Sequence, residues 1–287
     1  MFAIFRKEFK GFFTSPIGFI FVGFFLLLAG FIFALSNLMS ANPDYSQMLS
    51  FISSTFILLV PMLTMRLFSE EMKQRTDILL ITSPVRLSAI VLGKYFAALA
   101  LFLLTTLITC LYPIIMRFFG PIAVWEIVGG YIGFVLMGSA FISIGLFISA
   151  MTENQFIAAV VTLASLLFVM TLDWIQQGLP KDVTAGIVFS AILVAAAIVF
   201  VYLTTRNIYV SAGAGIVGAG IILLVYLLDQ MRFDGFITRF FEWLSLMKRF
   251  ERFNLGVLEL SPIIYFVSFS AAFVFLTIRL IEKRRWT

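Results

Sequence analysis

The chain contains eight long apolar stretches, and they restrict its fold more than any other feature of the sequence. Each has about 20 residues, the length that a helix needs to cross a hydrocarbon core of about 30 Å. Of the 287 residues, 62% are hydrophobic and 12% are charged, and no soluble-domain composition separates the stretches. We therefore predict an all-α fold, a polytopic membrane helix bundle that forms one domain over residues 1–287. The predicted spans are residues 16–36, 51–68, 90–116, 125–150, 155–174, 184–204, 209–228 and 261–280.

An amphipathic interface helix is predicted over residues 1–15, before the first span. Aromatic residues share one face at helical spacing, and basic residues share the other. The aromatic residues are Phe2, Phe5, Phe9 and Phe12, and the basic residues are Arg6, Lys7 and Lys10. A helix with this pattern lies in the plane of the membrane interface. A simple basic anchor would account for the same charges.

Proline and small residues mark helix starts and close packing. Three Ser-Pro pairs, Ser15-Pro16, Ser83-Pro84 and Ser261-Pro262, are typical of helix N-termini. Pro61 is expected to kink the second span. Two rows of small residues, Gly129 with Gly133 and Ser211 with Gly215 and Ala219, predict close helix contacts within the chain rather than a dimer seam.

The distribution of Lys and Arg predicts the orientation. Basic residues are concentrated near both ends of the chain, so both termini are placed in the cytoplasm, which agrees with an even number of spans. The same reasoning places the polar stretch after the second span, and Arg206, on the cytoplasmic side. The net charge of +5 is better explained by contact with anionic lipid than with nucleic acid.

Residues 229–260 conflict with this charge rule. Eight spans place the segment outside the cytoplasm, although it carries five basic residues. Phe236, Phe240, Trp243, Met247 and Phe250 predict one amphipathic helix lying on or dipping into the outer interface.

Several functional classes are disfavoured by what the sequence lacks. No predicted span has an ionisable residue at its centre, which argues against a proton-driven or voltage-driven machine but leaves sodium coupling open. A phosphate-binding loop is missing too, and the pair Gly93-Lys94 is interpreted only as the start of a span. Cys110 is the one cysteine and has no partner for an internal disulfide.

An intramembrane protease was the sharpest enzymatic hypothesis. Glu70-Glu71-Met72-Lys73-Gln74-Arg75 resembles the glutamate-pair motif of the CAAX-type proteases. Those enzymes also need histidines, and this chain has none. The absence of histidine also removes most zinc-based and triad-based chemistry.

The polar stretch over residues 69–89 stands out between two apolar spans. Glu71 and Arg75, like Glu70 and Gln74, are spaced i,i+4, which favours a helix that supports itself. The stretch then continues into an apolar patch at residues 78–81. This patch requires a contact, which could be the membrane interface, the bundle itself or a partner protein.

Several ordered stretches resemble one known family. They are Ser15-Pro16-Ile17-Gly18-Phe19-Ile20, Pro61-Met62-Leu63-Thr64-Met65-Arg66-Leu67-Phe68, Leu79-Leu80-Ile81-Thr82-Ser83-Pro84-Val85, Ile90-Val91-Leu92-Gly93-Lys94, Met151-Thr152-Glu153-Asn154-Gln155 and Arg284-Arg285-Trp286. Together they resemble the type-2 ABC transporter permeases, and most closely the gliding-motility, GldF-like branch.

The resemblance implies a transmembrane permease subunit of an ATP-driven ABC transporter, usually an exporter, in the inner (plasma) membrane of a bacterial cell. It implies a separate ABC ATPase subunit that binds ATP and Mg²⁺, a second permease copy or paralogue, and in some assemblies an extracytoplasmic accessory protein. No cofactor, metal or catalytic residue is expected in this chain itself.

The resemblance also implies which residues meet the ATPase. The coupling residues would be Glu70, Glu71, Arg75, Thr76, Ile78, Leu79, Leu80, Thr82, Ser83, Pro84 and Arg86, beside Arg6, Lys7, Glu8 and Lys10 of the interface helix. The family usually has Gly-Thr where this chain has Arg75-Thr76, so the local bend is in question. A membrane scaffold that anchors a secretion or motility complex without transport is the alternative function.

Overall fold

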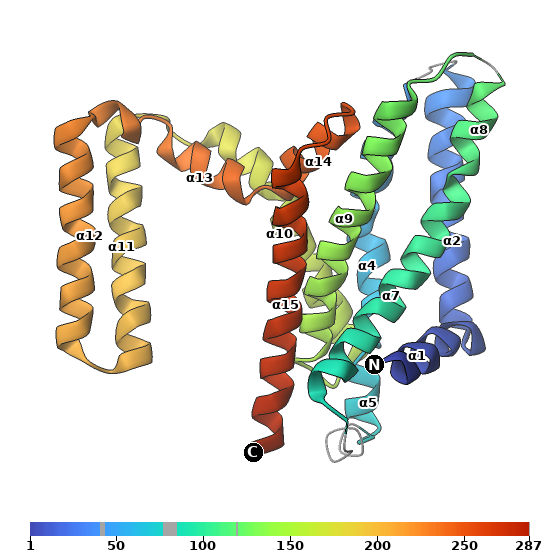
Figure 1. Cartoon of the computed structure of the whole chain (residues 1–287), viewed down its shortest axis with the longest axis horizontal. Coiled ribbons are helices and arrows are strands. Elements are labelled where there is room, and N and C mark those ends of the chain that lie inside the picture. The colour runs from blue at the N-terminus through green and yellow to red at the C-terminus, as the bar shows by residue number, and fades with distance from the viewer. Residues whose placement is uncertain (41–43, 77–84, 119, 287) are drawn as a thin grey trace. The chain divides into compact units, whose positions relative to one another are not determined.

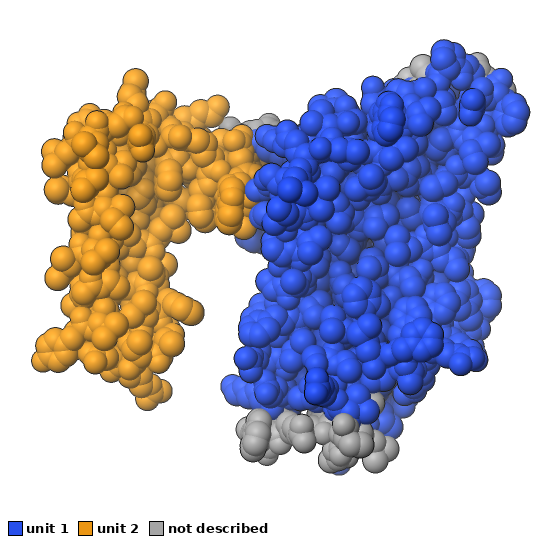
Figure 2. All heavy atoms as spheres, in the orientation of Figure 1, with its two compact units in different colours: residues 1–169, 246–287 blue, residues 170–245 orange. Residues whose placement is uncertain are grey.

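The structure, a computed structural model, describes residues 1–40, 44–76, 85–118 and 120–286. Within this part of the chain every regular element is a helix, which confirms the all-α prediction. The chain divides into two compact units (Figure 2). Unit 1 comprises Met1–Val169 and Leu246–Thr287, and unit 2 comprises Met170–Ser245. The interpretation of the chain as one permease domain stays a prediction.

Figure 1 labels most of the helices, and its colours follow the order of the chain. Unit 1 begins with α1 (Phe2–Thr14), α2 (Pro16–Phe33), the π-helix η1 (Ala34–Met39), α3 (Tyr45–Ser54), α4 (Phe56–Thr64), α5 (Ser69–Lys73), α7 (Leu87–Thr109), α8 (Leu111–Arg117) and α9 (Val124–Ser149). Helix α10 (Gln155–Gly178) passes into unit 2, which contains α11 (Val183–Thr205), α12 (Ile208–Leu228), the 3-10 helix η2 (Gln230–Phe233) and α13 (Phe236–Leu244). Unit 1 then resumes with α14 (Leu246–Asn254) and α15 (Leu260–Trp286).

Seven of these helices are long and apolar enough to cross a membrane, and a bent pair brings the number to eight. The bent pair is α3 and α4, which meet at 51°. The prediction for this span was wrong in two details. The pair begins at Tyr45 rather than at residue 51, and its bend lies at Thr55, whereas Pro61 lies inside α4. The bend has a local cause, because the Thr55 N–H bonds to Ile52 (2.9 Å) in a tightened turn.

The helix starts at Ser-Pro pairs are confirmed where they are described. Ser15 is the N-cap residue of α2, and Pro16 is its first residue. Ser261 and Pro262 lie in the first turn of α15, which begins one residue earlier. Ser83-Pro84 lies outside the described residues, and α7 begins at Leu87.

Phenylalanines from four helices form the centre of unit 1. Phe56 of α4 contacts Phe134 of α9 at 4.6 Å between ring centroids, with the rings tilted by 42°, and it meets Phe102 of α7 edge-on at 5.5 Å. Phe25 of α2 completes the cluster at 6.2 Å from Phe102. All four side chains are almost fully buried. They join α2, α4, α7 and α9 at the middle of the bundle, with α9 the most buried span.

The two ends of unit 1 differ in what they carry. Helices α1 and α5 and the C-terminal end of α15 lie at one end, and α14 lies at the other (Figure 1). This is the arrangement that an interface helix, a cytoplasmic polar stretch and an outer amphipathic segment require. The membrane side of each end stays a prediction.

The row formed by Gly129 and Gly133 packs within the chain, as predicted. A Cβ at Gly129 would lie 2.6 Å from the carbonyl oxygen of Phe253, and one at Gly133 would lie 2.6 Å from the Phe253 Cβ. Helix α14 is therefore held against α9. The side-chain amide of Asn254 adds hydrogen bonds to Ser50 Oγ (2.8 Å) and the Ser46 carbonyl (3.2 Å) of α3.

The prediction of one amphipathic helix within residues 229–260 was wrong. The segment forms η2, α13 and α14, and extended backbone at Ser245 (ψ 124°) separates the last two helices. As a result, Trp243 is exposed, whereas Phe250 is buried in unit 1. The five apolar residues therefore do not share one face.

Unit 2 is built around the α11–α12 hairpin. Gly215 and Gly218 of α12 face α11, where an added Cβ would lie 2.9 Å from Ile198 Cδ1 and 2.6 Å from Val194 Cγ1. Ser211 is buried on the same side. The predicted small-residue row thus packs within the chain, although Gly218 rather than Ala219 makes the close approach. Arg206 ends α11 in the left-handed conformation (φ 49°).

Candidate functional site

A buried lysine joins three helices at one end of unit 1. Lys94 of α7 has a side chain that is 2% exposed, and its Nζ lies 3.0 Å from Glu8 Oε1 of α1 and 3.0 Å from Glu71 Oε1 of α5. The ammonium group also lies 5.2 Å from the centre of the Phe68 ring. Lys7 approaches Glu71 from the exposed side at 4.0 Å.

Because Lys94 is buried, its ion pairs with Glu8 and Glu71 fix the positions of the three helices that carry these side chains. A buried charge costs several kcal/mol unless it is paired and hydrogen-bonded, so Lys94 requires both carboxylates. Glu71 is itself largely buried, and its Oε2 accepts no hydrogen bond among the described residues. Burial raises the pKa of the Glu71 carboxyl above its ordinary value, while Lys94 opposes that shift. The three side chains tie α1, α5 and α7 together.

The residue before Lys94 brings α1 close to α7. A Cβ at Gly93 would lie 2.9 Å from Ile4 Cγ2 and 3.3 Å from the Met1 carbonyl oxygen. Ile4 and Glu8 are one helical turn apart on α1, so this contact and the Glu8 ion pair share a face. The interpretation of Gly93-Lys94 as only a span start was wrong, because the pair forms the contact between α1 and α7.

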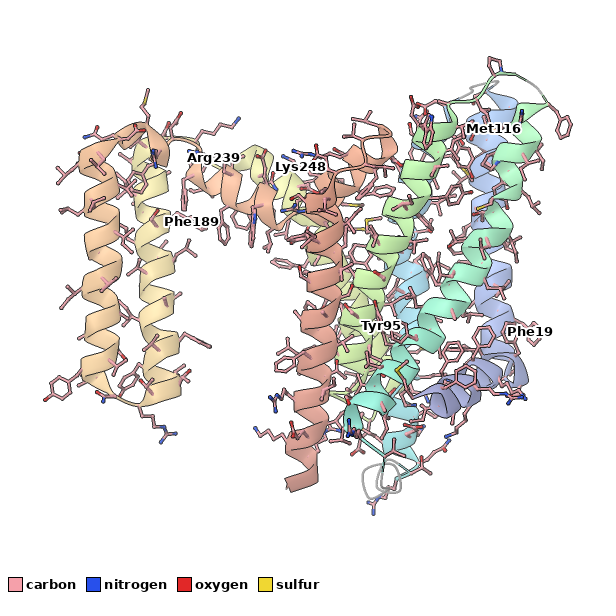
Figure 3. The ribbon with its side chains drawn as sticks, in the orientation of Figure 1. Phe19, Tyr95, Met116, Phe189, Arg239 and Lys248 are labelled. Atoms are coloured by element: carbon pink, nitrogen blue, oxygen red, sulfur yellow. The ribbon has the colours of Figure 1, made fainter. Side chains whose placement is uncertain are left out.

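The aromatic face of α1 differs by one residue from the prediction. Phe13, not Phe12, continues the row of ring contacts, and the row ends on Phe19 of α2 (Figure 3). Phe12 lies with Glu8 and Arg66 around a cavity of about 130 Å³ between α1 and the α4–α5 region. Arg6 and Lys10 are exposed.

The predicted i,i+4 pairs of the polar stretch do not form. Helix α5 ends at Lys73, before Gln74 and Arg75. Glu70 instead accepts two hydrogen bonds from Arg66, from Nε at 2.6 Å and from Nη2 at 2.7 Å. Glu71 pairs with Lys94, as described above. The stretch is therefore held by contacts to the bundle rather than by a long self-supporting helix.

Arg75 makes the sharp bend that follows α5. Its φ of 54° lies in the left-handed region. The N–H of Thr76 bonds to Glu71 O (2.9 Å), and the N–H of Arg75 bonds to Met72 O (3.0 Å), which is the Schellman arrangement at a helix C-terminus. Glycine is favoured in this position. The bend therefore forms without glycine, although an arginine occupies a strained conformation.

Two further helix ends hold α5 in place. Ser149 Oγ of α9 accepts hydrogen bonds from the N–H groups of Phe68 (2.9 Å) and Ser69 (3.3 Å) at the start of α5. Arg284 of α15 contacts the Met72 sulfur and donates to the Met151 carbonyl (3.2 Å), in the turn between α9 and α10. Asn154 of that turn caps α10 through the Phe156 N–H (2.9 Å).

Of the remaining predicted coupling residues, the structure describes only Arg86. Arg86 is the exposed N-cap residue of α7. Ile78, Leu79, Leu80, Thr82, Ser83 and Pro84 lie outside the described residues. Among the described residues, no three His, Cys, Asp or Glu side chains come together as metal ligands.

Lys94, Arg66 and Ser149 were missed as site residues. The sequence could have identified Lys94, because an isolated lysine near the start of an apolar span needs a carboxylate partner. Glu8 and Glu71 were among the acidic residues predicted on the same side of the membrane. Ser149 gave no comparable signal, because serine is common in apolar helices and its contact with α5 depends on the tertiary fold.

Comparison with known proteins agrees with this architecture. Residues 4–177, from α1 to the end of α10, match the family described as ABC-2 family transporter protein. The match covers more than half of the 287 residues, so the chain belongs to the ABC-2 family. Members of this family are the membrane permease components of ABC transporters, and the chain is accordingly a multi-pass membrane permease component. Comparison with curated proteins gave no match.

Proposed function

We propose that this permease is coupled to a separate ABC ATPase through the end of unit 1 that carries α1 and α5. The observation that supports the proposal is the pairing of buried Lys94 with both Glu8 and Glu71. A surface that receives mechanical work must be joined stiffly to the spans that move. Here Glu8 of the interface helix and Glu71 of the polar stretch both pair with the buried Lys94 of span α7.

The route from this surface into the spans is short. Helix α7 carries Lys94 near its start and Phe102 further along, and Phe102 belongs to the aromatic cluster with α2, α4 and α9. Since the cluster is closely packed, a displacement of α7 is transmitted to its neighbours. The ATPase would push on α5 and on residues 77–86, and α7 would carry the motion.

These 287 residues contain no phosphate-binding loop, so the nucleotide site would be supplied by an ABC ATPase partner. ATP and Mg²⁺ would bind to that partner. Since ABC ATPases work as dimers, a second permease, identical or similar, would complete the assembly. The resemblance to GldF-like permeases supports an exporter in the plasma membrane of a bacterial cell, with an extracytoplasmic accessory protein as a further partner.

The test places a charge in the apolar patch of the coupling segment. Leu80→Asp would bury an unpaired carboxylate at the ATPase contact, which is strongly unfavourable. We expect the variant to insert normally but to lose association with the ATPase and ATP-driven transport. Leu255→Asp is the matched control, because Leu255 is 71% exposed and directly follows α14, the helix at the opposite end of unit 1 (Figure 1). Normal ATPase binding and transport by Leu80→Asp would show that the coupling assignment is wrong.

Substrate-dependent ATP hydrolysis separates a transporter from a membrane scaffold. The complex of the chain with its ATPase, reconstituted in vesicles, should hydrolyse ATP faster when a transported substrate is added. The chain purified free of other proteins should show no ATPase activity. Hydrolysis by the isolated chain would contradict the requirement for a separate subunit.

A further inference from the structure

Unit 2 contains an apolar groove of about 580 Å³ between α11 and α12, closed at one end by η2 and α13. Its walls include Leu193 and Val194 of α11 and Ile221 and Val225 of α12. The volume lies within the range of about 300–1,000 Å³ that is usual for small-molecule sites. All of these residues belong to unit 2.

The groove follows α12 towards its C-terminal end. Its lining residues on this helix run from Gly218 to Val225, about one turn before the helix ends at Leu228, and η2 and α13 follow. At 1.5 Å per residue this segment is about 10 Å long, which fits within one leaflet of a hydrocarbon core of about 30 Å. A groove of this length can hold part of an acyl chain of a lipid in the leaflet at that end.

Two arginines lie at the mouth of the groove, at the end where the helices leave the membrane. Arg232 of η2 and Arg239 of α13 both line it, and none of its described lining residues is acidic (Figure 3 labels Arg239). Arg239 donates through Nη2 to the backbone carbonyls of Arg232 (2.7 Å) and Asp234 (2.6 Å), which positions its guanidinium. Arg232 uses its Nε for Asp229 at 3.3 Å.

These contacts leave both guanidinium groups able to bind an anion. A guanidinium has five N–H donors, and the described contacts use only one nitrogen of each arginine. The pair between Arg232 and Asp229 is exposed, at 73% and 46% of the two side chains, so it competes weakly with a phosphate. Two nearby arginines at the level of the headgroups match a phosphodiester.

We propose that the groove of unit 2 binds an anionic phospholipid, with its phosphate on Arg232 and Arg239 and an acyl chain along α11 and α12. Charge at the mouth, apolar walls and a length that fits within one leaflet occur together, and together they suit an amphiphile with an anionic headgroup. A protein segment in the same groove would not require the two arginines at its mouth. The site does not depend on coupling to an ATPase.

The experiment uses the full chain in lipid nanodiscs that contain a trace of photoactivatable lipid. The probe carries a diazirine near the end of one acyl chain and has either a phosphatidylglycerol or a phosphatidylcholine headgroup. Labelled peptides are identified by mass spectrometry. We expect peptides of α11 and α12 that line the groove to be labelled at least threefold more by the anionic probe.

Two pairs of variants test the headgroup and the chain separately. Arg232→Gln combined with Arg239→Gln should reduce labelling by the anionic probe to the level of the zwitterionic one. Arg206→Gln, at the opposite end of the α11–α12 hairpin, should not. Ile221→Trp should at least halve labelling by both probes, because it fills the groove. Leu223→Trp is its matched control, since both residues are similarly exposed, at 59% and 62%, and Leu223 does not line the groove.

Equal labelling by the two probes would overturn the proposal, as would labelling that the double arginine variant leaves unchanged. Absence of label from the groove would also overturn it and would indicate that protein covers these residues. Unchanged melting temperatures of the variants would show that any loss of label reflects lost binding rather than unfolding.

Discussion

At the scale of single residues, Lys94 ties α1, α5 and α7 together. Its ammonium is the only cation within ion-pair distance of Glu8 among the described residues, and it lies equally close to Glu71. If the cation is removed, two carboxylates remain near each other in a poorly hydrated place. Breaking a buried ion pair in this way costs far more than losing a surface pair.

We therefore expect Lys94→Met to destabilise the chain by about 3 kcal/mol. Thermal or chemical unfolding of the detergent-solubilised protein measures the change. Lys73→Met, at an exposed lysine of α5, should change stability by less than about 0.5 kcal/mol. Equal stability of the two variants would mean that the ion pairs of Lys94 contribute nothing to the free energy of unfolding.

Arg75 shows the opposite case, a residue whose replacement should stabilise the fold. It occupies a left-handed conformation (φ 54°) that costs an L-residue about 1 kcal/mol and costs glycine almost nothing. Arg75→Gly should therefore raise stability by up to about 1 kcal/mol, less the entropy that glycine adds to the unfolded chain. Arg206→Gly is a matched change, because Arg206 (φ 49°) also follows a helix end. Destabilisation by both substitutions would contradict the strain argument.

At the scale of elements, the sequence predicted the number and approximate bounds of the spans, because a membrane helix needs a long apolar run. It did not predict the break at Thr55 or the division of residues 229–260 at Ser245. The break at Thr55 is a local tightening of one helical turn that no proline or glycine marks, and the break at Ser245 depends on extended backbone at a single residue. The ion pairs of α5 were also mispredicted, because i,i+4 spacing matters only while the helix continues, and α5 ends at Lys73.

The contact between α1 and α7 provides a prediction at this scale. Gly93→Leu should push α1 away from α7, since even a Cβ would lie 2.9 Å from Ile4. Separation of the helices would weaken the pair between Lys94 and Glu8. Gly23→Leu in α2 is the control, because a Cβ there meets nothing within 4 Å. Limited proteolysis should cut after the basic residues of α1 faster in Gly93→Leu, and equal rates in the two variants would contradict the assigned contact.

At the scale of the whole molecule, the ends of unit 1 agree with an even number of spans. Helix α1 and the C-terminal end of α15 lie together, and α14 lies at the opposite end (Figure 1). The basic residues near both termini predicted that the two termini lie on the same side of the membrane. The basic residues of α14 conflicted with the same charge rule, because the span count places α14 on the other side. Burial of Phe250 and Phe253 explains why α14 stays on the bundle despite its charges.

Single cysteines test this topology in a chain whose only cysteine, Cys110, has been replaced by alanine. A cysteine at Arg252 of α14 should react with a membrane-impermeant maleimide in intact cells. A cysteine at Lys73 of α5 should react only after the cells are opened. Both side chains are exposed, so access to reagent decides the outcome. Labelling of Arg252→Cys only after lysis would show that α14 is cytoplasmic.

The most direct test of the account is a cross-link from α5 to the ATPase. A photoreactive benzoylphenylalanine at position 73 of the full chain, expressed with its native partners, should form a covalent adduct with a protein that carries a phosphate-binding loop. The same residue at position 255, directly after α14 at the opposite end of unit 1, should not form this adduct. An intact complex in which position 255 reacts with the ATPase and position 73 does not would contradict the proposed coupling surface.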